Sequence, residues 1–156
     1  MNFMLNGVTG SQLIGGRWIA SRGGAFCAIN PADGKTLAPE FHEASEAEVD
    51  QAAEAAETAF EQALDLAPGW SAGLLDAIAE QIMNLGDALL ERAEAETALP
   101  RARLTGERAR TVGQLKMFAA IVREGSWIDA VIDSADEART PARRPDLRRM
   151  LRPRGP

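Results

Sequence analysis

The sequence predicts a mainly helical fold with short β-strands near both ends of the chain. Residues 45–125 repeat apolar side chains at spacings of three and four, the period of an amphipathic helix. The residues before and after this stretch contain short apolar runs separated by glycine and proline, as strands and turns do. With 46% hydrophobic and 26% charged residues, a chain of 156 residues is expected to fold rather than remain disordered.

The N-terminal 44 residues contain a predicted β-hairpin and one further strand. Residues 12–14 and 17–19 flank Gly15-Gly16, a dipeptide that adopts the positive φ angles of a tight two-residue turn. A further strand is expected over 25–30, and it ends in the turn sequence of residues 31–34. We expect the β-structure of this region to stop at that turn.

A first amphipathic helix begins at Ser45. Ser45 and Glu48 have the capping-box spacing, in which each side chain bonds the backbone amide of the other residue. Apolar residues recur at helical spacing from Val49 to Leu64, while glutamates occupy other positions. Pro68-Gly69 is expected to end this helix.

Two further helices and a C-terminal segment follow. The second helix begins at about Ser71, is interrupted at Gly86, and continues to Pro100, which breaks the run or opens the next helix. The third covers residues 103–124 and stops at Gly125. Beyond it, short strands are expected near Val131-Ile132 and over 147–151, with a polar surface crossing between them.

Charge is distributed unevenly along the chain. The first 100 residues carry 16 acidic and 4 basic side chains, whereas residues 101–156 carry 7 acidic and 13 basic ones, so the two parts should attract. The arginine-rich tail suggests a nucleic-acid arm, but it lacks lysine and aromatic residues for base stacking. We therefore expect a solvated edge or a subunit surface, and no nucleic-acid partner. Without an apolar run of 18 residues or a leader sequence, a cytoplasmic protein outside membranes is expected.

Few residues of the chain suggest catalysis. The single cysteine, Cys27, lies in an apolar strand, and the single histidine, His42, is expected at the surface or as a helix cap. One residue of each type excludes an internal disulfide and a Cys/His zinc cage. The sequence also lacks a glycine-rich phosphate-binding loop, and Glu94 and Glu96 diverge on a helix, which disfavours a carboxylate pair.

Short motifs follow one another along the chain at residues 14–18, 28–34, 43–56, 78–82, 96–100, 104–115, 145–148 and 152–156. In this order they resemble the start of the aldehyde dehydrogenase superfamily. The last three segments are similar to the branch of the superfamily that oxidises alpha-ketoglutaric semialdehyde. One motif departs from the family pattern, because Ala98 stands where glycine is usual in the E-T-G-x-P element.

The resemblance implies that the chain is a truncated part of an α/β fold. Residues 1–156 would be the incomplete N-terminal part of an NAD(P)-binding domain that ends before the parallel nucleotide-binding sheet. Its parts would be a β-hairpin and turn region (1–44), amphipathic helices (45–125), and a crossing segment with a strand of the oligomerisation arm (126–156). The family's cofactor cleft, glutamate base and catalytic cysteine lie further along, so no catalytic residue is expected here and Cys27 is too early to be the nucleophile.

The resemblance also implies an activity and candidate binding residues. The expected enzyme is a cytoplasmic homo-oligomer that oxidises a small carboxylated aldehyde with NAD or NADP, and the isolated segment is expected to be inactive. A structural monovalent cation would be held by the backbone carbonyls of Ala28 and Ile29 and by the Glu96 side chain. Arg110 or Arg108 would bind the substrate carboxylate with a bidentate fork.

Other interpretations remain open at this stage. Arg108 and Arg110 would be ordinary surface arginines if they pair with the acidic first part of the chain. The chain as a whole would be a non-catalytic helical interaction module, or a truncated product, if it docks onto a full-length relative. The free edge of the strand at 147–151 is a candidate surface for such docking.

Overall fold

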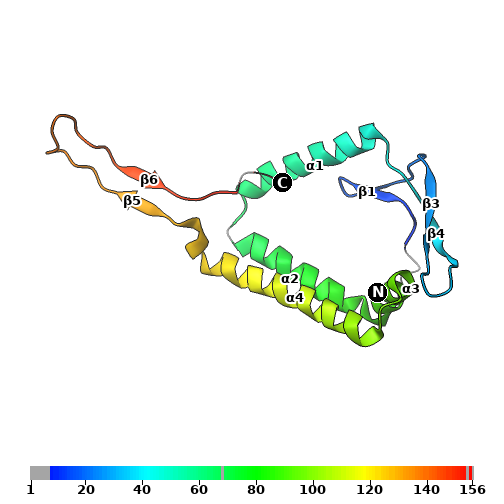
Figure 1. The fold of residues 1–156 in the computed structure, drawn as a ribbon. Coiled ribbons are helices and arrows are strands. Elements are labelled where there is room, and N and C mark those ends of the chain that lie inside the picture. The colour runs from blue at the N-terminus through cyan, green and yellow to red at the C-terminus, as the bar shows by residue number, and fades with distance from the viewer. Residues whose placement is uncertain (1–7, 68, 154, 156) are drawn as a thin grey trace.

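Helices dominate the structure, as the sequence predicts, and the strands of the described residues form short antiparallel pairs, of which the sequence predicted only the first. The computed structural model describes residues 8–67, 69–153 and 155, and within them the strands form three separate two-stranded sheets. The elements are β1 (Gln12–Ile14), β2 (Arg17–Ile19), β3 (Ala25–Ile29), β4 (Thr36–His42), α1 (Glu46–Leu64), α2 (Gly69–Asn84), α3 (Gly86–Thr97), α4 (Arg101–Glu124), a 3₁₀ turn (Ser126–Ile128), β5 (Val131–Asp133) and β6 (Leu147–Arg149) (Figure 1).

The predicted N-terminal hairpin is confirmed, and it is followed by a second hairpin that the sequence pattern does not predict. Gly15 and Gly16 connect β1 to β2 with φ angles of 55° and 77°. The expectation that β-structure stops at residue 34 is wrong, because β4 pairs with β3. The register shifts inside this pair, so that Ala38 and Pro39 have no partner on β3. This bulge and its proline interrupt the alternation by which a strand is recognised.

The capping box that starts α1 is confirmed. The Glu48 carboxylate accepts from the Ser45 backbone N–H at 2.7 Å, while the Ser45 Oγ accepts from the Glu48 N–H at 3.3 Å. The Glu48 carboxylate also accepts a hydrogen bond from the hydroxyl of the buried Ser21, at 3.0 Å. The hydrogen bond from the Ser45 backbone is the main cause that lowers the pKa of Glu48 below its ordinary value. The helix ends at Leu64, and the expected stop at Pro68 lies outside the described residues.

Glu48→Gln is expected to destabilise the chain at neutral pH but not in acid. The lowered pKa of Glu48 means that the folded state favours its carboxylate, so this stabilisation is complete above the ordinary pKa of 4.5. It is lost as the pH falls through the lower folded-state pKa. Glu46→Gln is the matched control, because Glu46 lies in the same helical turn without a role in the capping box. In thermal unfolding followed by circular dichroism, Glu48→Gln should melt below Glu46→Gln at pH 7, and the gap should close in acid.

The buried core lies mainly between α2 and α4, which run side by side (Figure 1). α2 starts at Gly69, two residues before the predicted start, and α4 follows directly after Pro100 as its N-cap. Gly125 has a φ of 81° and ends α4 as predicted. Alanines make up the buried part of α2, and Ala119, Leu104 and Val112 make up that of α4. The core residues on these helices are Ala72, Ala79, Leu104, Val112 and Ala119.

The C-terminal residues form a β-hairpin that extends away from the helices (Figure 1). β5 and β6 confirm the two predicted strands, although β6 ends at Arg149 and not at residue 151. The polar crossing between them is part of the hairpin, because Asp136 and Arg144 form an isolated bridge. Among the described residues, no helix combines the length and the hydropathy that a membrane span requires.

Candidate functional site

Arg108 and Arg110, the two candidate substrate-binding residues, lie on different faces of α4. Arg108 shares a helical stripe with the buried residues Leu104 and Val112, on the side that packs against α2 and α3. Arg110 is two positions further, which places it on the opposite side of the helix. We call this side the outer face of α4. It consists of Arg110, Gln114, Met117, Phe118 and Ile121, all of them exposed.

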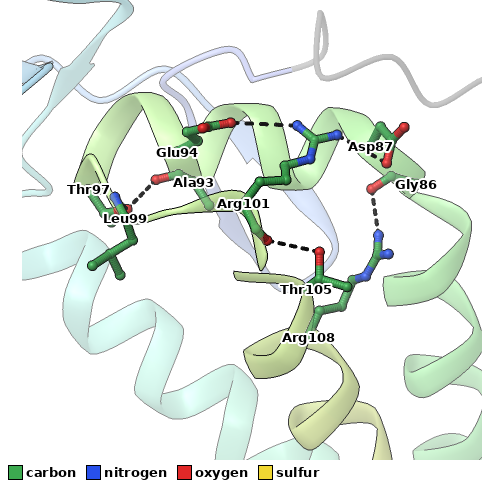
Figure 2. Close-up of polar contacts among 9 residues, drawn as sticks. All are labelled: Gly86, Asp87, Ala93, Glu94, Thr97, Leu99, Arg101, Thr105 and Arg108. Atoms are coloured by element: carbon green, nitrogen blue, oxygen red, sulfur yellow. Dashed lines mark hydrogen bonds and ion pairs between the residues drawn. The ribbon is translucent and has the colours of Figure 1, made fainter. Parts of the chain in front are cut away.

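Arg108 and Arg101 hold the corner between α3 and α4 (Figure 2). The Arg108 Nη1 donates to the Gly86 carbonyl oxygen at 2.7 Å, and this contact is partly buried. The Arg101 guanidinium lies 3.1 Å from Asp87 Oδ1 and 3.7 Å from Glu94 Oε2. Arg101 was not singled out from the sequence, although the expected attraction between the acidic and basic parts of the chain is realised here. These contacts fix α4 relative to α3, and thereby fix the direction of the outer face.

The end of α3 has the backbone conformation that favours the glycine usual in the E-T-G-x-P element. Ala98 is the C-cap of α3 and has a φ of 54°, in the left-handed region that favours glycine. The Thr97 hydroxyl accepts from the Leu99 backbone N–H at 3.3 Å and donates to the Ala93 carbonyl at 2.6 Å (Figure 2). The glycine that is usual at this position therefore matches the backbone conformation that Ala98 adopts here.

Arg110 is the more accessible of the two candidate substrate-binding arginines. Within residues 8–67, 69–153 and 155, its guanidinium forms no hydrogen bond or ion pair. The side chains of Met117, Phe118 and Ile121 are between 42% and 52% exposed along the same face. A guanidinium can bind a carboxylate, and apolar side chains on the same helix face can contact a short carbon chain.

The candidate cation ligands lie on two elements, and an arginine already occupies one of them. Ala28 and Ile29 belong to β3, and Glu96 belongs to α3. The Arg92 Nε lies 2.5 Å from Glu96 Oε1, and the Arg92 Nη1 donates to the Ala38 carbonyl of β4. This donor set does not suit a metal ion, because Arg92 pairs with Glu96 Oε1 and would place a second positive charge beside the ion. Arg92 was missed from the sequence, although it is the only Lys or Arg between Lys35 and Arg101 and precedes Glu96 by four residues.

Cys27 and His42 both lie in the β3–β4 pair. Cys27 is a free, half-buried thiol. His42 was expected at the surface or as a helix cap; it ends β4 and caps no helix, and its partly exposed side chain has Nε2 3.4 Å from Glu40 Oε1. In the part of the chain that the structure describes, no three His, Cys, Asp or Glu side chains cluster as metal ligands.

The chain matches known proteins over most of its length. The aldehyde dehydrogenase family model matches residues 18–145. Over 142 residues the chain is 49% identical to alpha-ketoglutaric semialdehyde dehydrogenase 2 of Azospirillum brasilense, covering 90% of this chain and 27% of that protein. It is 42% identical over 139 residues to alpha-ketoglutaric semialdehyde dehydrogenase of Acinetobacter baylyi, covering 89% and 26%. The chain thus spans about a quarter of the length of these relatives.

Solved structures share the fold at lower sequence identity. An NAD-dependent benzaldehyde dehydrogenase from Corynebacterium glutamicum superposes with a TM-score of 0.74 at 24% identity, over 85% of this chain and 28% of that one. Betaine aldehyde dehydrogenase from Staphylococcus aureus, solved in complex with NAD+, gives a TM-score of 0.74 at 18% identity, over 86% and 26% of the two chains. The elements described above are therefore arranged as in one part of these larger proteins.

Proposed function

The chain belongs to the aldehyde dehydrogenase family, and from this membership we propose that it forms the N-terminal part of an enzyme that oxidises alpha-ketoglutaric semialdehyde with NAD or NADP. The observation that carries the proposal is the 49% identity to the Azospirillum brasilense semialdehyde dehydrogenase over 90% of this chain. The segments 1–44, 45–125 and 126–156 would then form an incomplete part of the NAD(P)-binding domain. The products of the reaction are the dicarboxylic acid and the reduced cofactor.

In this proposal the segment binds and orients the substrate, and the reacting groups lie outside its 156 residues. A bound NAD or NADP would supply the hydride acceptor for the aldehyde carbon. Arg110 holds the carboxylate end of the substrate, and the apolar residues of the outer face contact its carbon chain. Arg108 lies on the inner side of the same helix, where its Nη1 is bonded to the Gly86 carbonyl, so Arg110 is the better placed of the two candidates. Cys27 has no catalytic role.

The segment also supports the rest of the enzyme. An open apolar groove with a volume of about 480 Å³ runs along α2, lined mainly by Leu74, Ile78, Ile82 and Leu85. Exposed apolar surface of this extent favours packing against further protein. We propose that the remaining domain covers α2 and that the β5–β6 hairpin joins subunits in a cytoplasmic homo-oligomer. The same groove favours the alternative function, in which the chain is a non-catalytic module that docks onto a full-length relative.

A chimera tests the proposal directly. The matching quarter of the Azospirillum brasilense relative is replaced by this chain, and the reduction of NAD or NADP is followed at 340 nm with alpha-ketoglutaric semialdehyde. We expect turnover by the chimera, and no turnover by the isolated 156-residue chain above that of its Cys27→Ala variant. A folded chimera that oxidises other aldehydes but not alpha-ketoglutaric semialdehyde would contradict the proposed substrate. Turnover by the isolated chain would contradict the assignment of the reacting groups.

A further inference from the structure

A bulge in β4 leaves a backbone carbonyl beside α3. Cys27 pairs with Glu40 and the next residue, Ala28, pairs with Leu37, so Ala38 and Pro39 are extra residues on β4. The Ala38 carbonyl accepts a hydrogen bond from Arg92, which is 54 positions further along the chain. A side chain of α3 therefore binds the hairpin at the one place where the β3–β4 ladder is interrupted.

The Arg92 guanidinium connects this carbonyl to an acidic side chain. Its Nε lies 2.5 Å from Glu96 Oε1, one helical turn further along α3. The Arg92 side chain is only 21% exposed, and its Nη2 is buried without a hydrogen-bond partner among the described residues. The positive charge is thus held by two contacts, and Arg92 is the only basic residue between Lys35 and Arg101 in the sequence.

We propose that Arg92 supplies the positive charge at this position, and that the protein takes no monovalent metal ion here. A sodium or potassium ion at Ala28, Ile29 and Glu96 would neutralise a carboxylate and bind backbone carbonyls. The guanidinium already pairs with the same carboxylate, Glu96, and donates to a backbone carbonyl of the same strand pair, that of Ala38 on β4. A metal ion next to it would lie close to a charge of the same sign, which is unfavourable. This inference does not depend on the proposed function.

Thermal unfolding in different salts tests the inference on the unmodified chain. The melting temperature is measured in NaCl, KCl and choline chloride at equal ionic strength, because choline is too large for a carbonyl site. We expect the same melting temperature in all three salts. A higher melting temperature in NaCl or KCl, saturating with concentration, would overturn the inference.

Arg92→Gln tests the role of the guanidinium, with Arg103→Gln as the matched control. Arg103 forms the same type of pair with Glu107, four residues later on α4, but at 4.0 Å and with both side chains more than half exposed. We expect Arg92→Gln to lower the melting temperature by several degrees and Arg103→Gln to leave it nearly unchanged. If Arg92→Gln fails to fold while Arg103→Gln folds, the result would also support the structural role of the Arg92 guanidinium. Equal melting temperatures of the two variants would contradict it.

Discussion

Ala79→Leu is expected to destabilise the chain by about 1–3 kcal/mol, the usual cost of inserting extra methylene groups into a packed core. Ala79 on α2 and Ala119 on α4 are both 0% exposed, on the two helices that make the main core. A leucine at position 79 has no space unless α2 moves away from α4. This movement would disturb the largest packed contact between helices in the described part of the chain.

Ala77→Leu is the control for this substitution. Ala77 lies on the same helix but lines the open groove of α2, where a leucine adds apolar surface without a clash. Denaturant unfolding followed by circular dichroism should give Ala77→Leu a free energy of unfolding within about 0.5 kcal/mol of the parent. Similar losses for both variants would show that the α2–α4 contact is not closely packed.

Local signals explain why the helices were predictable from the sequence. Each of these signals involves residues close together in the sequence. They are the capping box at Ser45, the glycine at position 125 and the helical spacing of the apolar residues between them. Those signals set where helices begin and end with an error of about two residues, as at α2. They do not determine which elements pack together.

Long-range contacts account for what the sequence did not reveal. β4 was missed because the bulge at Ala38-Pro39 breaks its alternation, and only the pairing with β3 identifies it as a strand. The role of Arg92 depends on the same bulge and was hidden for the same reason.

The charge asymmetry between the two parts of the chain predicted only some of the ion pairs. Arg101 and Arg123 pair with Asp87 and Asp76 of the acidic first part, as expected. In the C-terminal hairpin, however, Arg149 pairs with Asp133 on the adjacent strand. Nearby carboxylates satisfy these arginines, so net charge alone did not predict their partners.

Arg108 and Arg110 show how far the candidate site could be predicted from the sequence. From the sequence, both arginines are two positions apart on one helix and both suit a carboxylate. Only the packing of α4 against α2 and α3 shows that Arg108 lies on the inner stripe and bonds Gly86. Arg110 lies on the outer face, and this difference makes the two arginines experimentally separable.

Arg110→Ala in the chimera is expected to lower kcat/KM for alpha-ketoglutaric semialdehyde by about 10- to 100-fold. This range corresponds to the loss of one hydrogen-bonded charge contact, worth about 1.5–3 kcal/mol, at about 1.4 kcal/mol for each factor of ten. An uncharged aldehyde such as butanal has no carboxylate for Arg110 to bind. We therefore expect its kcat/KM to stay within about twofold of the parent chimera, a difference below 0.5 kcal/mol.

Arg108→Ala separates substrate recognition from support of the fold. Its contact with the Gly86 carbonyl fixes the α3–α4 corner, so its loss should lower the melting temperature and reduce activity toward both aldehydes to a similar extent. Steady-state kinetics with the semialdehyde and with butanal, for both variants, distinguishes the two roles. A larger selective loss in Arg108→Ala than in Arg110→Ala would assign the carboxylate to Arg108, because only the residue that binds the charged end can discriminate between these two substrates.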